Sequence, residues 1–254
     1  DTKYMKSQRD AFFDALYEKA INDKRIIVLT ADCGAPALDR WQENIPDQFI
    51  NVGIAEQNMV AVAMGLALSG KRPYCYAIIP FLTGRAYDQI RIACMMNLPI
   101  VFVGLGAGYS YDDSGPTHHG IDDIGLMRML PNMEIISIPA WGWAELHATI
   151  VDNPRYIRLD REEVTREVQR FTPHIIVNGK SFTPNWIKPL GWMPWDIKNG
   201  DTVEVIEEHL IGGLGSIIAE YIAEKELKVK FERRYIKDYS YAYGREKLRK
   251  LNEL

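Results

Sequence analysis

The chain has 254 residues, which is long for one domain and short for two, since a domain usually has about 100–200 residues. Hydrophobic residues make up 47% and charged residues 25%, values that are typical of a globular protein and leave little room for disorder. The net charge of −4 gives no electrostatic support for non-specific nucleic-acid binding, and every apolar run is shorter than the roughly 20 residues that a membrane span needs.

Helix and strand patterns alternate along the first 160 or so residues. In chain order, they predict a helix at 10–20, strands at 25–29 and 49–52, a helix at 56–68, a strand at 74–79, a helix at 85–96, a strand at 99–103, a helix at 123–129, a strand at 134–138, a helix at 141–150 and a strand at 156–159. The helix at 56–68 is apolar on all sides, which predicts that it is buried. Strands that alternate with helices indicate an α/β fold in which helices flank a mostly parallel sheet.

The pattern changes near residue 162. Prolines and tryptophans are concentrated between 163 and 200, where we find no helical or strand period. Regularity returns with a strand at 202–206, a helix at 214–223, a strand at 229–231 and a helix at 245–251. We therefore predict a domain at 1–162, an irregular connection at 163–200 and a smaller domain at 201–254.

The cysteines and the first residues of the sequence indicate the cellular compartment. Cys33, Cys75 and Cys94 lack the spacing of a disulfide framework or a redox motif, which fits a reducing compartment. The first 18 residues are too charged for a signal peptide. We expect a cytoplasmic protein that binds neither nucleic acid nor a membrane.

Glu56 is a carboxylate at the start of the most apolar helix. The structural explanation is that the helix dipole favours an acidic residue in the first turn. The functional alternative is a partly buried carboxylate that hydrogen-bonds a ligand nitrogen and exchanges a proton.

Two further segments could carry chemistry. His118 and His119 are adjacent in a glycine-flanked turn, so they cannot easily face one metal, and no third ligand has zinc spacing. A general acid–base or oxyanion-binding histidine is the functional alternative to a polar turn that caps nearby backbone. The run from Gly212 to Ser216 follows a predicted strand, but it lacks the Gly-x-Gly-x-x-Gly spacing, so close helix–strand packing explains it better than phosphate binding.

Several motifs, in the same order along the chain, resemble the pyrimidine-binding domain of transketolase-like, thiamine-diphosphate-dependent enzymes. They are 49–59 (FINVGIAEQNM), 84–91 (GRAYDQIR), 115–120 (GPTHHG), 122–128 (DDIGLMR), 131–133 (PNM) and 207–215 (EEHLIGGLG). The chain is most similar to the C-terminal half of split transketolases, with deoxyxylulose-phosphate synthase and the β subunits of 2-oxo-acid dehydrogenases as near relatives. This implies a pyrimidine-binding domain followed by a shortened α/β transketolase C-terminal domain.

The resemblance implies a cofactor site in this chain. Glu56 matches the glutamate that hydrogen-bonds N1′ of the aminopyrimidine and so promotes loss of the proton from C2 of the thiazolium. Phe81 matches the aromatic residue that stacks on the pyrimidine. Ile78 occupies a second cofactor-binding position, and Asp32 matches a carboxylate near the cofactor.

The resemblance also implies substrate-binding residues. His118 matches the histidine that handles the substrate hydroxyl or carbonyl. Arg9 and Arg161 match arginines that bind a sugar phosphate, which a planar guanidinium can grip with two hydrogen bonds.

Two positions depart from the family pattern. Gly106 stands where transketolases usually have a histidine and deoxyxylulose-phosphate synthases an arginine. Ser114 stands where an aspartate usually recognises a donor hydroxyl, and the adjacent Asp113 could take its place. These departures point to a different or modified sugar.

The sequence contains no Gly-Asp-Gly motif, with which the family holds the diphosphate and its divalent ion. The resemblance therefore implies a partner chain that carries this motif and binds Mg or Ca, an α₂β₂ assembly and a shared thiamine diphosphate. The expected reaction is transfer of a two-carbon ketol unit between sugar phosphates or modified sugars. The alternatives are a condensation like that of deoxyxylulose-phosphate synthase, a decarboxylating condensation of a 2-oxo acid, and a catalytically silent subunit.

Overall fold

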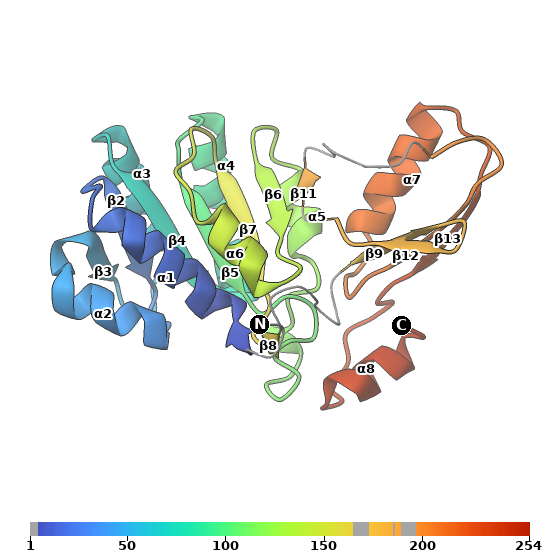
Figure 1. Cartoon of the computed structure of the whole chain (residues 1–254), viewed down its shortest axis with the longest axis horizontal. Coiled ribbons are helices and arrows are strands. Elements are labelled where there is room, and N and C mark those ends of the chain that lie inside the picture. Colours follow the sequence, from blue (N-terminus) through green and yellow to red (C-terminus); the bar gives the residue numbers. More distant parts are fainter. Residues whose placement is uncertain (1–4, 165–172, 185, 189–196) are drawn as a thin grey trace.

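The computed structural model describes residues 5–164, 173–184, 186–188 and 197–254, which form two large sheets and a small two-stranded one (Figure 1). The larger sheet has seven strands in the order β11-β6-β7-β5-β4-β2-β3. Its strands are β2 (Ile26–Thr30), β3 (Phe49–Asn51), β4 (Arg72–Ile78), β5 (Val101–Leu105), β6 (Glu134–Ser137), β7 (Arg155–Leu159) and β11 (Trp186–Lys188). All neighbours are parallel except β11 and β6, so the prediction of a mostly parallel sheet is confirmed.

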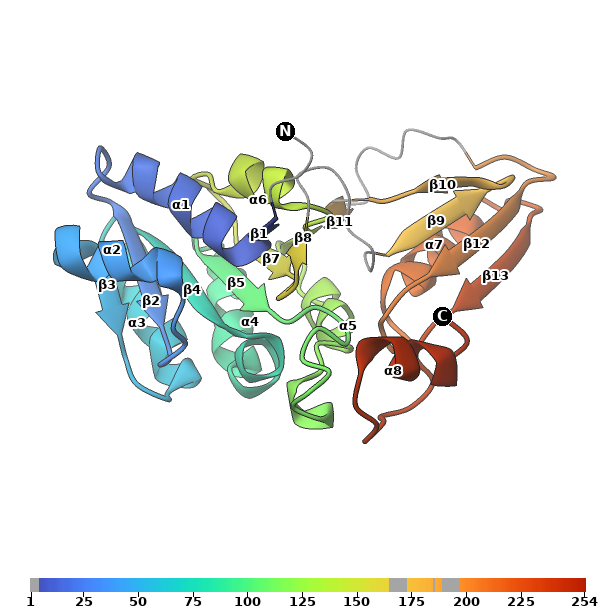
Figure 2. The same ribbon diagram turned by 60° about the horizontal axis from the view of Figure 1, so that its bottom comes forward.

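Helices cover both faces of this sheet (Figure 2). One face carries α1 (Gln8–Ala20), α2 (Pro36–Asn44) and α6 (Trp141–His147), and the other carries α3 (Glu56–Leu68), α4 (Tyr87–Met95) and α5 (Asp123–Arg128). Alternate residues of a strand belong to the two hydrophobic cores, one on each face of the sheet. In β2, Ile26 and Val28 belong to the core with α1, whereas Ile27 and Leu29 belong to the core with α3. Burial on both faces explains the continuous apolar runs of the central strands.

A smaller sheet follows, with the strand order β10-β9-β12-β13. It consists of β9 (His174–Val177), β10 (Lys180–Phe182), β12 (Thr202–Ile206) and β13 (Lys230–Arg234), with α7 (Leu214–Glu224) connecting the parallel pair β12 and β13. The last helix, α8 (Arg245–Leu251), lies below this sheet in Figure 2. Strands β1 (Lys6–Ser7) and β8 (Glu163–Val164) pair with each other, and the turns η1 (Pro46–Gln48), η2 (Pro80–Arg85) and η3 (Pro116–His118) complete the fold.

The prediction that 163–200 has no regular structure is wrong, because β8, β9, β10 and β11 lie there. These strands have two to four residues, too few to establish a period. Strand β11 also pairs with β6, some fifty residues earlier, and no local pattern reveals such a pairing. The proline- and tryptophan-rich stretch at 189–196 lies outside the described residues. Helix α2 was not predicted either, although Pro36 at its first position is a typical start signal.

Helix α3 has the predicted bounds, but it is buried on one face only. Met59, Val60 and Ala63 are fully buried, whereas Leu68 is 64% exposed. On α4, Met95 is 72% exposed. Large apolar side chains that are exposed to water are typical of surfaces that bind another molecule.

His147 makes the stability of the fold depend on pH. Its imidazole is stacked on Trp143 and meets the edge of Trp186, and burial together with the charge of Arg155 lowers its pKa to about 4. The unfolded chain takes up this proton near pH 6.5, so the free energy of unfolding should fall as the pH falls from about 6.5 to about 4, by roughly 1–3 kcal/mol. Urea unfolding at pH 7 and pH 4.5 should show a smaller loss for His147→Gln than for the native chain, and equal losses would refute this role.

Candidate functional site

The predicted site residues gather where parallel strands end. Asp32 follows β2, Ile78 ends β4, Gly106 follows β5 and Arg161 follows β7. Ligands bind at this edge of open parallel sheets, because the loops that leave the carboxyl ends diverge there and leave a crevice.

Glu56 lies at the first position of α3, and only 2% of its surface is exposed. Arg85 donates a hydrogen bond from Nη1 to Oε2 of Glu56 at 2.7 Å. A buried carboxylate needs such a partner, because loss of hydration otherwise costs several kcal/mol. The pair leaves Glu56 both buried and anchored. Arg85 lies in one of the motifs that resemble the family, but no role was predicted for it from the sequence. Arg85 is the last residue of the π-helical turn η2, and such turns are frequent at functional sites.

Phe81 connects this pair to His118. The guanidinium of Arg85 lies over the Phe81 ring at 4.6 Å, and the His118 imidazole meets the same ring edge-on at 5.0 Å. Glu56 therefore offers a hydrogen-bond acceptor, and Phe81 offers a flat apolar surface, within one small region. These are the two features that an aminopyrimidine ring requires, so the residues present fit the predicted cofactor.

Asp32 and Ile78 belong to the same region. Asp32 has a left-handed backbone conformation (φ 61°), which reciprocal hydrogen bonds with the Asn51 side chain hold in place at 3.1 and 3.2 Å. Burial raises the pKa of the Cys33 thiol, a hydrogen bond to the Ile78 backbone opposes this, and the charges of Glu56 and Asp32 raise it further. The Cys33 thiol thus interacts with three of the four predicted cofactor residues, Ile78, Glu56 and Asp32.

The predicted substrate residues form one chain of contacts. His118 shares a hydrogen bond with Thr117 and faces the Tyr111 ring at 5.9 Å. The Arg161 guanidinium lies 4.8 Å from the same ring and donates to Asp113 at 2.9 Å. This hydrogen bond holds the pKa of the Asp113 carboxyl below its usual value. Tyr111 was not predicted, and nothing in its local sequence identifies it.

Arg9 approaches the group from α1. It pairs with the neighbouring Asp10 at 3.0 Å. Burial raises the pKa of Tyr111, and the positive charges of Arg161 and Arg9 both oppose this rise, so both arginines lie near the tyrosine. Guanidinium groups are typical phosphate ligands, because they can donate two parallel hydrogen bonds.

The surroundings of Gly106 favour a glycine at this position. Gly106 has φ +101°, and a Cβ there would lie 2.5 Å from Cδ2 of Tyr111. The Tyr111 ring therefore fills the space that a larger residue at position 106 would take. His119 is buried away from the site and meets the ring of Tyr109 edge-on at 5.0 Å, so the two adjacent histidines have separate surroundings.

The glycines before α7 do not form a phosphate site. Glu207 accepts hydrogen bonds from the amides of Leu214 at 2.7 Å and Gly215 at 2.8 Å. A Cβ at Gly213 would lie 2.3 Å from its carboxylate. An internal carboxylate thus occupies the helix start, and the packing explanation is correct.

The described part of the chain has neither a metal cluster nor a membrane span. No group of three or more histidine, cysteine, aspartate or glutamate side chains among these residues could hold a metal ion. None of their helices is long and apolar enough to cross a bilayer.

Comparisons with known proteins find related sequences and a related structure. Residues 5–166 match the family described as "Transketolase, pyrimidine binding domain". An apulose-4-phosphate transketolase subunit of Actinobacillus succinogenes is 32% identical over 264 residues, which cover 87% of this chain and 85% of that protein. "1-Deoxy-D-xylulose-5-phosphate synthase" of Methylacidiphilum infernorum is 29% identical over 88% of this chain, which spans only 42% of that protein. A solved "Split gene transketolase, inactive beta4 tetramer" has a TM-score of 0.72 and 25% identity over 97% of this chain and 93% of its own.

Proposed function

The chain belongs to the family of transketolase pyrimidine-binding domains, and we propose that it is the pyrimidine-binding subunit of a two-chain transketolase-like transferase. Its reaction is the transfer of a two-carbon ketol unit between phosphorylated or modified sugars. The observation that carries this proposal is the buried Glu56, anchored by Arg85 beside the ring of Phe81.

The chain's own residues have distinct tasks in this reaction. When bound, thiamine diphosphate supplies the carbon nucleophile, at C2 of its thiazolium. Glu56 would hold the aminopyrimidine through N1′ and move a proton there, while Phe81 stacks on the ring and Ile78 and Asp32 line its surroundings. Because Glu56 is buried, its hydrogen bond to a ring nitrogen would not compete with water.

The substrate tasks fall to the second group of residues. His118, with Nδ1 fixed by Thr117, would hold or move a proton at the substrate carbonyl or hydroxyl oxygen. Arg9 and Arg161 would bind the phosphate. Asp113 would face a substrate hydroxyl or orient the Arg161 guanidinium through their hydrogen bond. The relative that is named for apulose-4-phosphate supports a phosphorylated substrate.

A deoxyxylulose-phosphate-synthase-like condensation is the second candidate, because a synthase of that kind is 29% identical to this chain. Assays with a ketose phosphate and with pyruvate as donor separate the two. Ketol transfer from the ketose phosphate alone supports the first function, and turnover of pyruvate supports the second.

The partner would bind the diphosphate through a Gly-Asp-Gly motif and a Mg or Ca ion, and we expect an α₂β₂ complex in the cytoplasm. The absence of the motif from this sequence supports a second chain. So do the exposed apolar side chains Ile54, Leu68, Met95 and Met96 on or beside α3 and α4. The related structure that contains only β subunits is described as inactive.

Assembly should depend on the exposed face of α3. We expect the purified chain to be inactive and to gain ketol-transfer activity by at least about a hundredfold with the partner chain. Leu68→Lys should weaken the complex at least about tenfold, because a charge would replace apolar contact area. The control Ile21→Lys alters an apolar residue that is 41% exposed at the end of α1. Analytical ultracentrifugation should show intact assembly for the control only, and intact assembly for both would contradict the proposed interface.

A further inference from the structure

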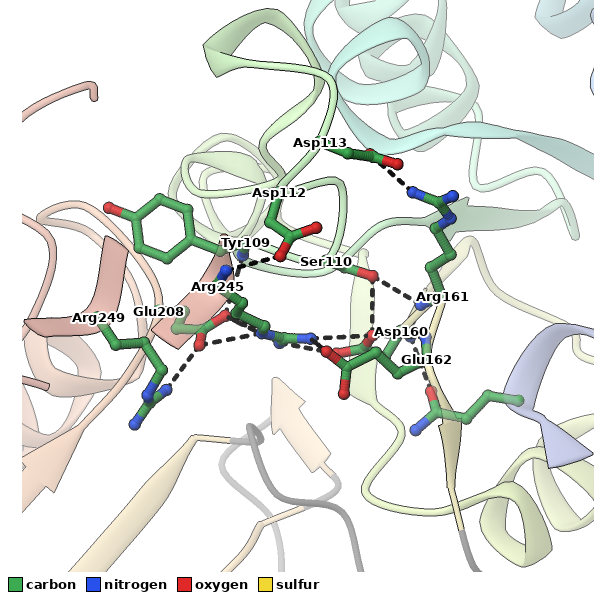
Figure 3. A network of polar contacts seen from close by, with 11 residues as sticks. Tyr109, Ser110, Asp112, Asp113, Asp160, Arg161, Glu162, Glu208, Arg245 and Arg249 are labelled. Atoms are coloured by element: carbon green, nitrogen blue, oxygen red, sulfur yellow. Dashed lines mark hydrogen bonds and ion pairs between the residues drawn. The ribbon is translucent and has the colours of Figure 1, made fainter. Parts of the chain in front are cut away.

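The loop that carries Tyr111 and Asp113 is fixed by a buried network of charges that reaches it from the second sheet (Figure 3). Arg245, the first residue of α8, is 4% exposed. Its Nη2 lies 2.8 Å from Asp160 and 2.8 Å from Glu208, and Nη1 lies 3.1 Å from Glu162. Asp160 follows β7 of the large sheet and Glu208 follows β12 of the small one, so this guanidinium joins the two units.

The network holds the loop from the side of the small sheet. Glu208 accepts a hydrogen bond from the amide of Tyr109 at 2.9 Å. The Arg245 amide donates to the Asp112 carboxylate at 2.6 Å, and the Gly244 amide donates to the Asp112 carbonyl at 3.2 Å. Gly108 lets the backbone come this close, because a Cβ there would lie 2.3 Å from the Glu208 carboxylate.

The same network reaches the two arginines that we expect to bind phosphate. Asp160 accepts from the Ser110 hydroxyl at 2.8 Å, and that hydroxyl accepts from the Arg161 amide at 2.7 Å. The Asp160 amide donates to the side chain of Gln8 at 2.8 Å, and Gln8 directly precedes Arg9. These hydrogen bonds therefore end on the backbone of Arg161 and on Gln8, the neighbour of Arg9.

We propose that Arg245 is a positioning residue for the substrate phosphate. Through Asp160 and Glu208 it holds the 109–113 loop and the backbone of Arg161 where the phosphate is bound. This inference rests on the proposed function and extends it to the small C-terminal unit, which thereby supplies part of the active site's support. Without the guanidinium, the buried carboxylates of Asp160 and Glu208 would lose the cation that they share, and the loop would no longer be held in place.

A second ion pair also joins the two units, away from the 109–113 loop. Arg128 on α5 pairs with Glu220 on α7 at 3.0 Å, on elements that do not carry the 109–113 loop. This pair is also more exposed, at 22% and 55% for the two side chains. Arg128→Lys is therefore a matched control for Arg245→Lys, since both change a guanidinium that links the units.

The test compares acceptors with and without a phosphate in the assembled enzyme. Arg245→Lys keeps the charge but loses the fork that pairs with two carboxylates. KM for glyceraldehyde 3-phosphate should rise by about tenfold or more, while KM for glyceraldehyde and kcat for both change less than about twofold. Arg128→Lys should change neither KM. Equal changes for the two acceptors, or an effect of the control as large as that of Arg245→Lys, would overturn the positioning role.

A second variant covers the case in which Arg245→Lys does not fold. Ser110→Ala cuts the link between Asp160 and Arg161 without removing a charge, and it should raise KM for the phosphorylated acceptor alone by about threefold. A folded Ser110→Ala enzyme with native KM values would refute the positioning role. Failure of the proposed function would give a different result, because the Glu56→Gln enzyme would then keep native activity.

Discussion

Replacing Glu56 with glutamine should lower kcat of the assembled enzyme by about a thousandfold or more, in the range known for loss of a proton-transferring side chain. Glutamine has nearly the same shape, and its amide oxygen can still accept the hydrogen bond from Arg85. It cannot share a proton with a ring nitrogen, because it carries no titratable group. The effect should therefore appear in turnover and not in assembly.

The measurement is steady-state ketol transfer with a matched carboxylate change elsewhere. Glu18→Gln removes an exposed carboxylate of α1 that pairs with Arg40 at 3.2 Å, and it should leave kcat within about twofold of native. Circular dichroism and ultracentrifugation establish that both variants fold and assemble. If Glu56→Gln keeps near-native turnover, this residue is not the proton-transferring group and the proposed function fails.

Replacing Arg158 with methionine should lower the free energy of unfolding by about 3–5 kcal/mol, because it leaves a buried carboxylate without its charge partner. Arg158 Nε lies 2.7 Å from Asp123, and the two side chains are 4% and 0% exposed. The hydroxyl of Tyr156 donates to the same carboxylate at 2.7 Å, and Arg158 also donates to the carbonyl of Gly120 at 2.8 Å. Although burial raises it, the charge of Arg158 holds the pKa of Asp123 below its usual value.

Urea unfolding near pH 7 checks this, with two companion variants. Asp123→Asn combined with Arg158→Met should recover part of the loss, since no unpaired buried charge remains. Arg25→Met breaks an exposed pair with Asp23 and should cost less than about 1 kcal/mol. A loss for Arg158→Met that is no larger than the loss for Arg25→Met would mean that the buried pair is not important for stability.

Much of the fold follows from local pattern. The apolar helix at 56–68 has the predicted bounds, and the strands of the large sheet lie within a few residues of the predicted ones, because burial on both faces produces continuous apolar runs. Strand β11 was missed since three residues carry no period and their pairing with β6 is set by tertiary contact. The exposed Leu68 shows the same limit, because a sequence records that a face is apolar but not which molecule covers it.

The candidate site could likewise be predicted only in part from the sequence. The family resemblance, confirmed by the match over residues 5–166, pointed to Glu56, Phe81 and His118, and the structure places Phe81 against His118 and beside the partner of Glu56. Their roles stay predictions until they are measured. Arg85 and Tyr111 were missed because each acquires its meaning from a distant side chain. Arg245 was missed for the same reason, since a single basic residue in a charged helix looks like surface until its three carboxylate partners are seen.

An active site shared between two chains is tested most directly by the affinity of thiamine diphosphate for the separate and the assembled proteins. Isothermal titration calorimetry with Mg²⁺ present should detect no tight binding to this chain alone, and a Kd at least about a hundredfold lower for the complex with the Gly-Asp-Gly chain. Turnover of sugar phosphates should appear in the complex only. Tight binding of thiamine diphosphate to this chain alone, together with turnover of sugar phosphates, would contradict the two-chain active site.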